Sequence, residues 1–116
     1  MNMKQLDFKG GSLIYLFYLV WSLVAEKVRC AGANIGLNTG VNIGLARSVD
    51  SCANKCKGKS SMFIFGTNLY GRQQCWGASC ICYCEVTATP DGQCDHVTHR
   101  GYKLYKFVAK GRVIIP

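Results

Sequence analysis

Cysteine carries most of the reactive chemistry in this chain, which has eight cysteines among 116 residues. They are Cys30, Cys52, Cys56, Cys75, Cys80, Cys82, Cys84 and Cys94. An even number of cysteines behind an export signal is typical of a disulfide framework, because thiols oxidise outside the reducing cytosol. The sequence therefore predicts that all eight form disulfides in a small secreted protein.

The spacing of the cysteines predicts which elements these disulfides join. Cys52 and Cys56 are four residues apart, so on a helix they face the same side. The alternating cysteines of 80–84 would share one face of a strand. Eight cysteines permit about 105 pairings, which leaves the connectivity open. We expect the helix pair to bond within the region from Cys75 to Cys84, and the first and last cysteines to bond each other.

Zinc coordination is the alternative use of these side chains. The Cys-x-Cys-x-Cys row, followed by Cys94-Asp95-His96 and His99, offers thiolate and imidazole ligands. The spacing does not follow a known zinc-binding pattern, and an oxidising compartment favours disulfides. We therefore expect no metal and no cofactor, and we place both histidines in loops.

A catalytic constellation is not recognisable in the sequence. A cysteine nucleophile needs a free thiol of low pKa beside a histidine, and here every cysteine can pair. The few carboxylates have predicted structural positions rather than catalytic ones: Asp50 at a helix start, Asp91 in a turn and Glu85 on a strand. The sequence also lacks a nucleophile elbow, a phosphate loop and a His-Glu metal helix. We predict that the chain is not an enzyme.

The first 25 residues have the pattern of a secretory signal peptide. Lys4 and Lys9 precede an almost wholly apolar run over 13–25, which is shorter than the roughly 20 residues that span a bilayer. Cleavage after Ala25 is expected, with cleavage after Ser22 or a retained signal anchor as alternatives. The prediction is a secreted protein without a stable membrane span.

The remaining segment, 26–116, is basic, with twelve Lys and Arg residues against five Asp and Glu residues. A small cationic secreted protein is attracted to acidic glycans, lipid headgroups and acidic proteins. Because the charges are spread rather than gathered in one block, a surface that only aids solubility fits equally well. No nucleic-acid motif occurs, so we expect no nucleic-acid partner.

Local signals predict the elements of one small domain. Ser48 is suited to cap a short helix over 48–57. Residues 61–67, 79–86 and 102–108 are strand-like, and the lysines of the last run indicate an edge strand. The fold class is therefore α+β: a small disulfide-rich domain with one short helix packed on an antiparallel sheet.

Glycine and asparagine recur in the segment before the helix, 26–47, where Asn-Ile-Gly-Leu occurs twice. Both residue types favour turns, so we predict an irregular arm, with a β-hairpin or self-association segment as the alternative. The cysteine-rich module then spans 48–108. The tail, 109–116, either adds a further strand or hangs free of the domain.

Aromatic and basic side chains interleave in the second half of the chain, which suits contacts with sugar rings, acidic groups or protein surfaces. The strand-like Phe63, Phe65 and Tyr83 are expected to fill the core. The predicted binding residues are Tyr70, Arg72, Trp76, Arg100, Lys103 and Lys106.

The order of these features resembles PAN/apple-type extracellular modules over about 48–108. The resemblance rests on Ser48-Val49-Asp50-Ser51-Cys52-Ala53-Asn54-Lys55-Cys56, Phe63-Ile64-Phe65-Gly66, Cys75, the cysteine row of 80–84 and Gly101-Tyr102-Lys103-Leu104-Tyr105. It implies helix cysteines bonded to sheet cysteines, in a module that binds proteins or carbohydrates and is not itself an enzyme. The three-cysteine strand departs from the family pattern. The stretch 71–77 (GRQQCWG) is also similar to the WSC carbohydrate-binding family.

From these observations we expect a secreted, disulfide-stapled binding module that recognises an extracellular protein or an acidic carbohydrate. The alternative is a secreted cationic antimicrobial or toxin-like effector. That alternative lacks the long amphipathic basic helix with which many such peptides bind membranes.

Overall fold

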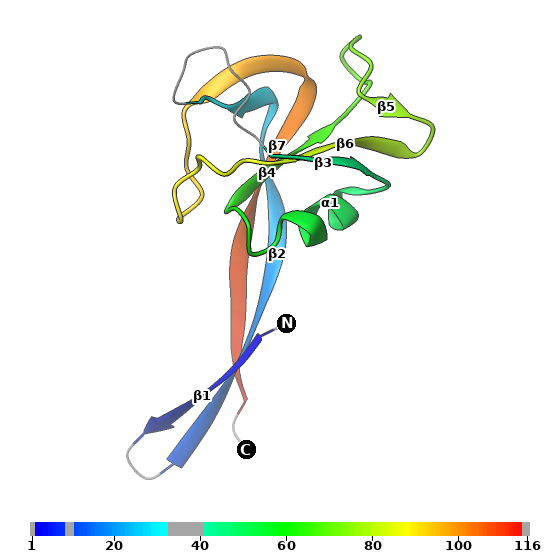
Figure 1. Ribbon diagram of the computed structural model, residues 1–116. Coiled ribbons are helices and arrows are strands. Elements are labelled where there is room, and N and C mark those ends of the chain that lie inside the picture. Colours follow the sequence, from blue (N-terminus) through cyan, green and yellow to red (C-terminus); the bar gives the residue numbers. More distant parts are fainter. Residues whose placement is uncertain (1, 9–10, 33–40, 115–116) are drawn as a thin grey trace. The chain divides into compact units, whose positions relative to one another are not determined.

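A computed structural model describes residues 2–8, 11–32 and 41–114 of the chain (Figure 1). Its strands are β1 (Asn2–Phe8), β2 (Gly11–Cys30), β3 (Val41–Ala46), β4 (Met62–Gly66), β5 (Cys75–Trp76), β6 (Ser79–Cys84) and β7 (His96–Ile114), and its helix is α1 (Val49–Cys56). Within the described residues the sheet order is β1-β2-β7-β4-β6-β3, with β5 paired to β6. The β3–β6, β4–β6, β4–β7 and β5–β6 pairs are antiparallel. The predicted fold class is confirmed.

Two compact units divide the chain, and each is described by itself. The first takes the residues up to Trp21 and those from Phe107 onward, and the second runs from Ser22 to Lys106. In the first unit, β1 pairs antiparallel with the start of β2. The predicted signal peptide, 1–25, thus contributes to both strands, and its cleavage stays a prediction. Among the described residues, no helix has the length and apolarity that crossing a membrane requires.

The short helix α1 has the boundaries that its sequence predicts. Ser48 is extended, and its Oγ accepts a hydrogen bond from the backbone N–H of Ser51 at 3.0 Å. Asp50 lies in the first turn, where a negative charge suits the helix dipole. After the C-cap residue Lys57, Gly58 takes a φ of +79°, a left-handed conformation that favours glycine. These caps favour helix formation in a segment that is too short to form a stable helix alone.

Four disulfides hold the fold, and together they include all eight cysteines. The helix is bonded to β6 twice, by Cys52–Cys82 and Cys56–Cys84. The prediction that Cys30 reaches Cys94 is confirmed, with Cα atoms 5.5 Å apart. The fourth bridge, between Cys75 and Cys80, closes the small β5–β6 hairpin.

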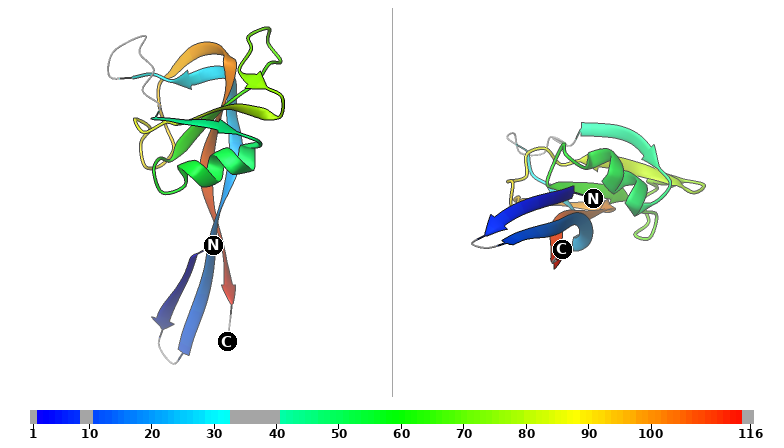
Figure 2. Two further views of the ribbon diagram at one scale, coloured as in Figure 1. Left: turned by 45° about the vertical axis from the view of Figure 1, so that its right-hand side comes forward. Right: turned by 90° about the horizontal axis from the view of Figure 1, so that it is seen from below.

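One face of the sheet in the second unit is covered by α1 (Figure 2). Phe63 and Phe65 of β4 lie directly opposite Cys84 and Cys82, the two β6 cysteines that bond to the helix. Phe63 is fully buried and stacks on Tyr105, with the ring centroids 5.2 Å apart. The predicted core position of Phe63 is therefore confirmed, and Phe65 is partly buried on the same face.

The opposite face carries the apolar core cluster of Cys30, Met62, Ile64, Tyr102 and Leu104. Ile64 and Leu104 are directly paired across β4 and β7, and both are fully buried. Burying a side chain of this size contributes roughly 1.5–3 kcal/mol. Use of both sheet faces compensates for the limited core that a short chain can form.

The prediction of an irregular arm over 26–47 is wrong at both ends of this segment that the structure describes. Residues up to Cys30 belong to β2, and Val41–Ala46 forms the strand β3, which pairs with β6. Asn42 Oδ1 accepts a hydrogen bond from the N–H of Gly44, whose φ is +88°. The turn chemistry that predicted irregularity is thus accommodated as a bulge within a strand. The first copy of the repeat, 34–37, lies outside the described residues.

The last strand also differs from its prediction. The run 102–108 is not an edge strand, because β7 lies between β2 and β4 in the sheet. β7 begins at His96 and continues to Ile114, so the predicted tail continues this strand through residue 114. His96 and His99, which we expected in loops, therefore lie on β7. The strand β2, which extends into the segment assigned to the leader, is the neighbour of β7 in the sheet. This pairing explains why 102–108 is not an edge strand and why β7 continues through residue 114.

Candidate functional site

The loop between β4 and β5, residues 67–74, is held in shape by Asn68. Its Oδ1 accepts hydrogen bonds from the backbone N–H groups of Gln74 (2.7 Å) and Cys75 (2.9 Å). Its Nδ2 donates to the carbonyl of Cys75 at 3.2 Å. A single side chain therefore closes the loop by bonding the backbone at its far end.

Gln74 fixes the same loop to the sheet. It packs against Gly66 of β4 and Gly101 of β7, at points where neither position has room for a Cβ atom. A Cβ atom at Gly66 would lie 2.8 Å from Gln74 Cβ, and one at Gly101 would collide with Gln74 Cγ. The carbonyl of Gln74 also accepts a hydrogen bond from the N–H of Ile81 at 3.0 Å. The loop is thus seated directly on the sheet.

The hairpin that follows is closed by the Cys75–Cys80 disulfide. These two cysteines are directly paired across β5 and β6, with their Cα atoms 4.0 Å apart. Gly77 turns the chain between the strands with a φ of +63°, which favours glycine. The hairpin lies next to the loop that leads into it (Figure 1) and presents Trp76, which is 50 % exposed.

We name four side chains of this loop and hairpin, Leu69, Tyr70, Arg72 and Trp76, the aromatic–basic tip. Leu69 is 71 % exposed, Arg72 is exposed and Tyr70 is half-buried. Tyr, Trp and Arg are the residues most enriched in binding hot spots. Three of the six predicted binding residues, Tyr70, Arg72 and Trp76, therefore lie on this loop and the hairpin that follows it.

Tyr70 is bordered by two charged residues of β2. Lys27 has a φ of +62°, a left-handed conformation that costs a non-glycine residue on the order of 1–2 kcal/mol. Its Nζ lies 4.6 Å from the centroid of the Tyr70 ring, a cation–π contact. Partial burial, followed by a hydrogen bond to Glu26 and the charge of that carboxylate, raises the pKa of the Tyr70 hydroxyl.

Lys103 joins this group from β7. Its Nζ lies 3.6 Å from Glu26 Oε1, and the two side chains are 24 % and 47 % exposed. Lys103 thus borders Tyr70 through a shared partner, Glu26. An ion pair with this exposure is worth roughly 0–1 kcal/mol, so the pair adds little to the stability of the fold.

The three predicted binding residues on β7, Arg100, Lys103 and Lys106, do not all lie on one face of the sheet. Lys103 and Lys106 are an odd number of residues apart in an unbroken register with β4, so they lie on opposite faces. The Lys106 side chain runs beside Gly92, at the 89–92 turn. Arg100 is exposed near the start of β7. Of these three bases, Lys103 is the one linked by its contacts to the tip.

His99 is a neutral hydrogen-bond acceptor packed against an aromatic ring. Its ring stacks on Tyr102 with the centroids 3.8 Å apart, and its Nδ1 accepts the N–H of Gly101 at 3.2 Å. Burial, followed by the positive charges of Arg72 and Arg29, lowers the pKa of His99. The imidazole therefore adds no positive charge to this surface near neutral pH.

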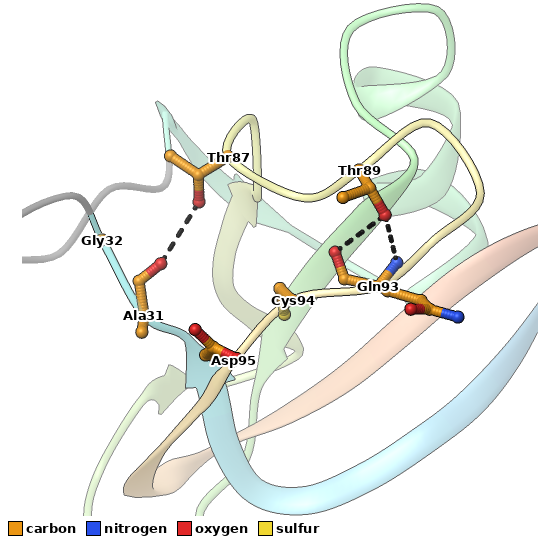
Figure 3. Close-up of a pocket in the computed structure, with 7 residues that line it drawn as sticks. All are labelled: Ala31, Gly32, Thr87, Thr89, Gln93, Cys94 and Asp95. Carbon is orange, nitrogen blue, oxygen red and sulfur yellow. Dashed lines mark hydrogen bonds between the residues drawn. The ribbon is translucent and has the colours of Figure 1, made fainter.

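A separate pocket of about 480 Å³ lies between the end of β2 and the segment before β7 (Figure 3). Its lining consists of Ala31, Gly32, Thr87, Thr89, Gln93, Cys94 and Asp95. Thr87 Oγ1 donates to the carbonyl of Ala31, and Thr89 Oγ1 bonds the backbone of Gln93, so both hydroxyls are used within the protein. None of the six predicted binding residues lies in this lining, and neither a basic nor an aromatic side chain does.

The cysteine sulfurs are not free thiolates in this structure. The Sγ atoms of Cys52, Cys56 and Cys82 lie within 4.8 Å of one another, yet each belongs to a disulfide. Among the described side chains, the carboxyl group with the most altered pKa is that of Glu85, which is fully buried just after β6. Burial raises its pKa to about 7, against the opposing effects of the Cys30 N–H and the Arg29 charge.

Sequence reasoning missed the residues that shape and border the tip: Lys27, Asn68, Leu69 and Gln74. The role of Asn68 could have been predicted, because asparagine side chains often form hydrogen bonds with nearby backbone groups in loops. The two glycines that receive Gln74 also indicated close approach, but not which side chain approaches. The left-handed conformation of Lys27 has no counterpart in the sequence pattern.

Comparisons with known proteins give no further guide. No protein-family model, curated protein or solved structure matches this chain.

Proposed function

We propose that the chain is a secreted binding module whose aromatic–basic tip recognises an anionic extracellular partner, either an acidic glycan or the acidic surface of a protein. The observation that supports this most is the exposure of Leu69, Arg72 and Trp76 on a loop and hairpin whose backbone is fixed in place. Fixing the backbone before binding lowers the entropy lost on association.

The charge of the second unit supports an anionic partner. Residues 22–106 include ten Lys and Arg residues against five Asp and Glu residues, and one of those acids is the buried Glu85. Lys27 and Lys103 bring ammonium groups to Tyr70 and its partner Glu26. A surface of this sign speeds encounter with anionic partners and makes the affinity sensitive to salt.

The disulfides support an extracellular role. Bridges of this density are typical of secreted domains and are rare in the cytosol. The two helix-to-sheet bridges are also in keeping with the resemblance to PAN/apple-type modules, which stays a prediction together with the signal peptide. A binding module needs a fixed surface rather than a reactive group, and every cysteine of this chain is bonded.

Matched substitutions in the tip test this function. Binding of the oxidised protein is measured against a sulfated polysaccharide (heparin), a neutral dextran and a panel of extracellular protein domains. We expect Leu69→Ala and Arg72→Gln to weaken binding at least tenfold. Leu45→Ala and Arg47→Gln, which alter an exposed leucine and an exposed arginine elsewhere, should leave it unchanged.

Two outcomes would contradict the proposal. One is equal loss of affinity in the tip variants and in their controls, which would indicate charge or hydrophobicity in general rather than a site. The other is leakage of anionic phospholipid vesicles at low micromolar protein without saturable binding. That result would favour the cationic effector instead.

A further inference from the structure

The carboxylate of Glu26 is held at the surface by donors from two other parts of the chain. Lys103 Nζ, on β7, lies 3.6 Å from its Oε1, and the hydroxyl of Tyr70 bonds the same side chain. The carboxylate therefore occupies a place where an ammonium group and a phenol converge. This arrangement binds an anion, and here the anion is supplied by the protein itself.

Lys27 brings a second ammonium group to the ring of Tyr70. Its left-handed backbone turns the side chain so that Nζ lies 4.6 Å over the Tyr70 ring. Lys27 is exposed to solvent. Backbone strain of this kind is concentrated at functional sites, where it fixes a group in advance.

The internal anion is replaceable. Glu26 is 47 % exposed, so its side chain can turn into solvent without opening the core. An ion pair at this exposure is weakly held, because water competes for both partners. A stronger external anion can therefore take over the same donors.

We propose that Lys27, Tyr70 and Lys103 form an anion subsite for a sulfate or carboxylate group of an acidic sugar chain, and that Glu26 occupies this subsite in the free protein as an internal competitor. The inference rests on the proposed function and names its ligand class. Two ammonium groups act as point charges, which suit an anion that approaches in several orientations, whereas planar bidentate pairing requires arginine. Trp76 is half exposed in the hairpin that follows the loop of Tyr70, and an exposed indole ring can stack on a sugar.

The test removes the competitor and measures a gain in affinity. Calorimetry with a heparin-derived hexasaccharide compares Glu26→Ala with Asp95→Ala, an exposed acid on the pocket wall whose loss changes the net charge equally. Glu26→Ala should bind at least threefold more tightly than Asp95→Ala. Glu26→Gln, which keeps the side-chain volume, should show a smaller gain of the same sign.

A second substitution links the gain to the subsite. Adding Lys103→Gln to Glu26→Ala should remove the gain, whereas adding Lys57→Gln, at an exposed lysine beyond the helix, should preserve most of it. Unfolding curves for all variants confirm that the fold is intact. Equal affinities of Glu26→Ala and Asp95→Ala, or weaker binding by Glu26→Ala, would overturn the inference.

The two proposals can fail separately. If tip substitutions weaken binding but Glu26→Ala matches its control, the function stands and the subsite does not. If the gain appears with an acidic peptide (polyglutamate) and not with the hexasaccharide, the ligand is a protein and the sugar assignment is wrong. If no anionic probe binds, the proposed function itself fails.

Discussion

The backbone N–H of Cys30 donates a hydrogen bond to Glu85 Oε2 across 3.1 Å, and so joins the end of β2 to the residue after β6. The other carboxylate oxygen, Oε1, is buried without a hydrogen-bond partner among the described residues. Arg29, itself 6 % exposed, is the nearby positive charge that favours the ionised form. Tyr102, which packs in the same core, has its pKa raised to about 12, chiefly by burial, and stays neutral.

We predict that stability falls as the pH rises through the titration of Glu85. Its pKa is about 7 in the folded protein and 4.5 ordinarily, so the folded state binds more protons between these values. The full stability is therefore present below pH 4.5 and is lost as the pH rises through 7. The shift corresponds to a loss on the order of 3 kcal/mol. Urea unfolding of the oxidised protein at a series of pH values measures it.

Glu85→Gln supplies the control for this prediction, because a neutral amide keeps an acceptor for the Cys30 N–H. The variant should lose most of the stability difference between pH 4.5 and pH 8. His99 contributes the opposite slope, since its lowered pKa reduces stability as the pH falls. Subtracting the free energy of unfolding of the variant from that of the wild type at each pH cancels the contribution of His99. A pH profile that Glu85→Gln leaves unchanged would contradict the assignment.

The contacts of Gln74 predict a selective rescue. Gly101→Ala places a Cβ atom against the Gln74 side chain, and Gly66→Ala places one 2.8 Å from Gln74 Cβ and 3.0 Å from its carbonyl oxygen. Each substitution should destabilise the protein by about 1–3 kcal/mol, the usual cost of overpacking. Adding Gln74→Ala should recover stability in Gly101→Ala and not in Gly66→Ala, where the Cβ atom and backbone remain. Rescue of both, measured by urea unfolding, would show that the glycines have another role.

The N-cap of α1 predicts a further loss. Ser48→Ala removes the hydroxyl that accepts from the Ser51 N–H, and should cost about 1 kcal/mol. The loss should appear in global unfolding, because two disulfides tie the helix to the sheet. Ser48→Asp keeps an acceptor at the same position and should retain most of the stability. A similar loss in both variants would mean that the cap does not act through this hydrogen bond.

The disulfides should differ in their effect on stability. Cys30–Cys94 joins residues 64 positions apart, whereas Cys75–Cys80 joins residues five apart. From loop-closure entropy, the paired alanine variants should lose about 4 kcal/mol and about 2 kcal/mol, respectively. Denaturant unfolding of each double variant gives both values. A larger loss on removing the short bridge would show that the hairpin stabilises the fold through contacts instead.

Local patterns in the sequence were enough to predict the helix and the way it is attached. Ser48 and the i,i+4 spacing of Cys52 and Cys56 depend only on neighbouring residues, and both are seen in the structure. The strand β3 could not be predicted in this way, because its order comes from pairing with β6, far along the chain. The interior position of β7 depends similarly on β2, which overlaps the segment assigned to the leader.

In the candidate site, too, the residues on neighbouring elements could be predicted, whereas those that depend on distant contacts could not. Tyr70, Arg72 and Trp76 were predicted from a polar loop and a short hairpin, and these elements follow one another in sequence. Alternation along 102–108 places Lys103 and Lys106 on opposite faces of a strand, and the register with β4 agrees with this. The roles of Lys27 and Glu26 depend on contacts with Tyr70 and Lys103, more than 40 positions away, which no local pattern contains.

The Cys30–Cys94 bridge encloses the other three, since all six remaining cysteines lie between its ends. A ribosome releases the chain from its N-terminus, so Cys30 is made first and its partner last. The thiol of Cys30 must therefore wait through the synthesis of six competitors before its proper partner exists. Fidelity of oxidation in this protein is thus a matter of timing, and shuffling of early, incorrect bonds by an isomerase should limit the rate at which the native protein is produced.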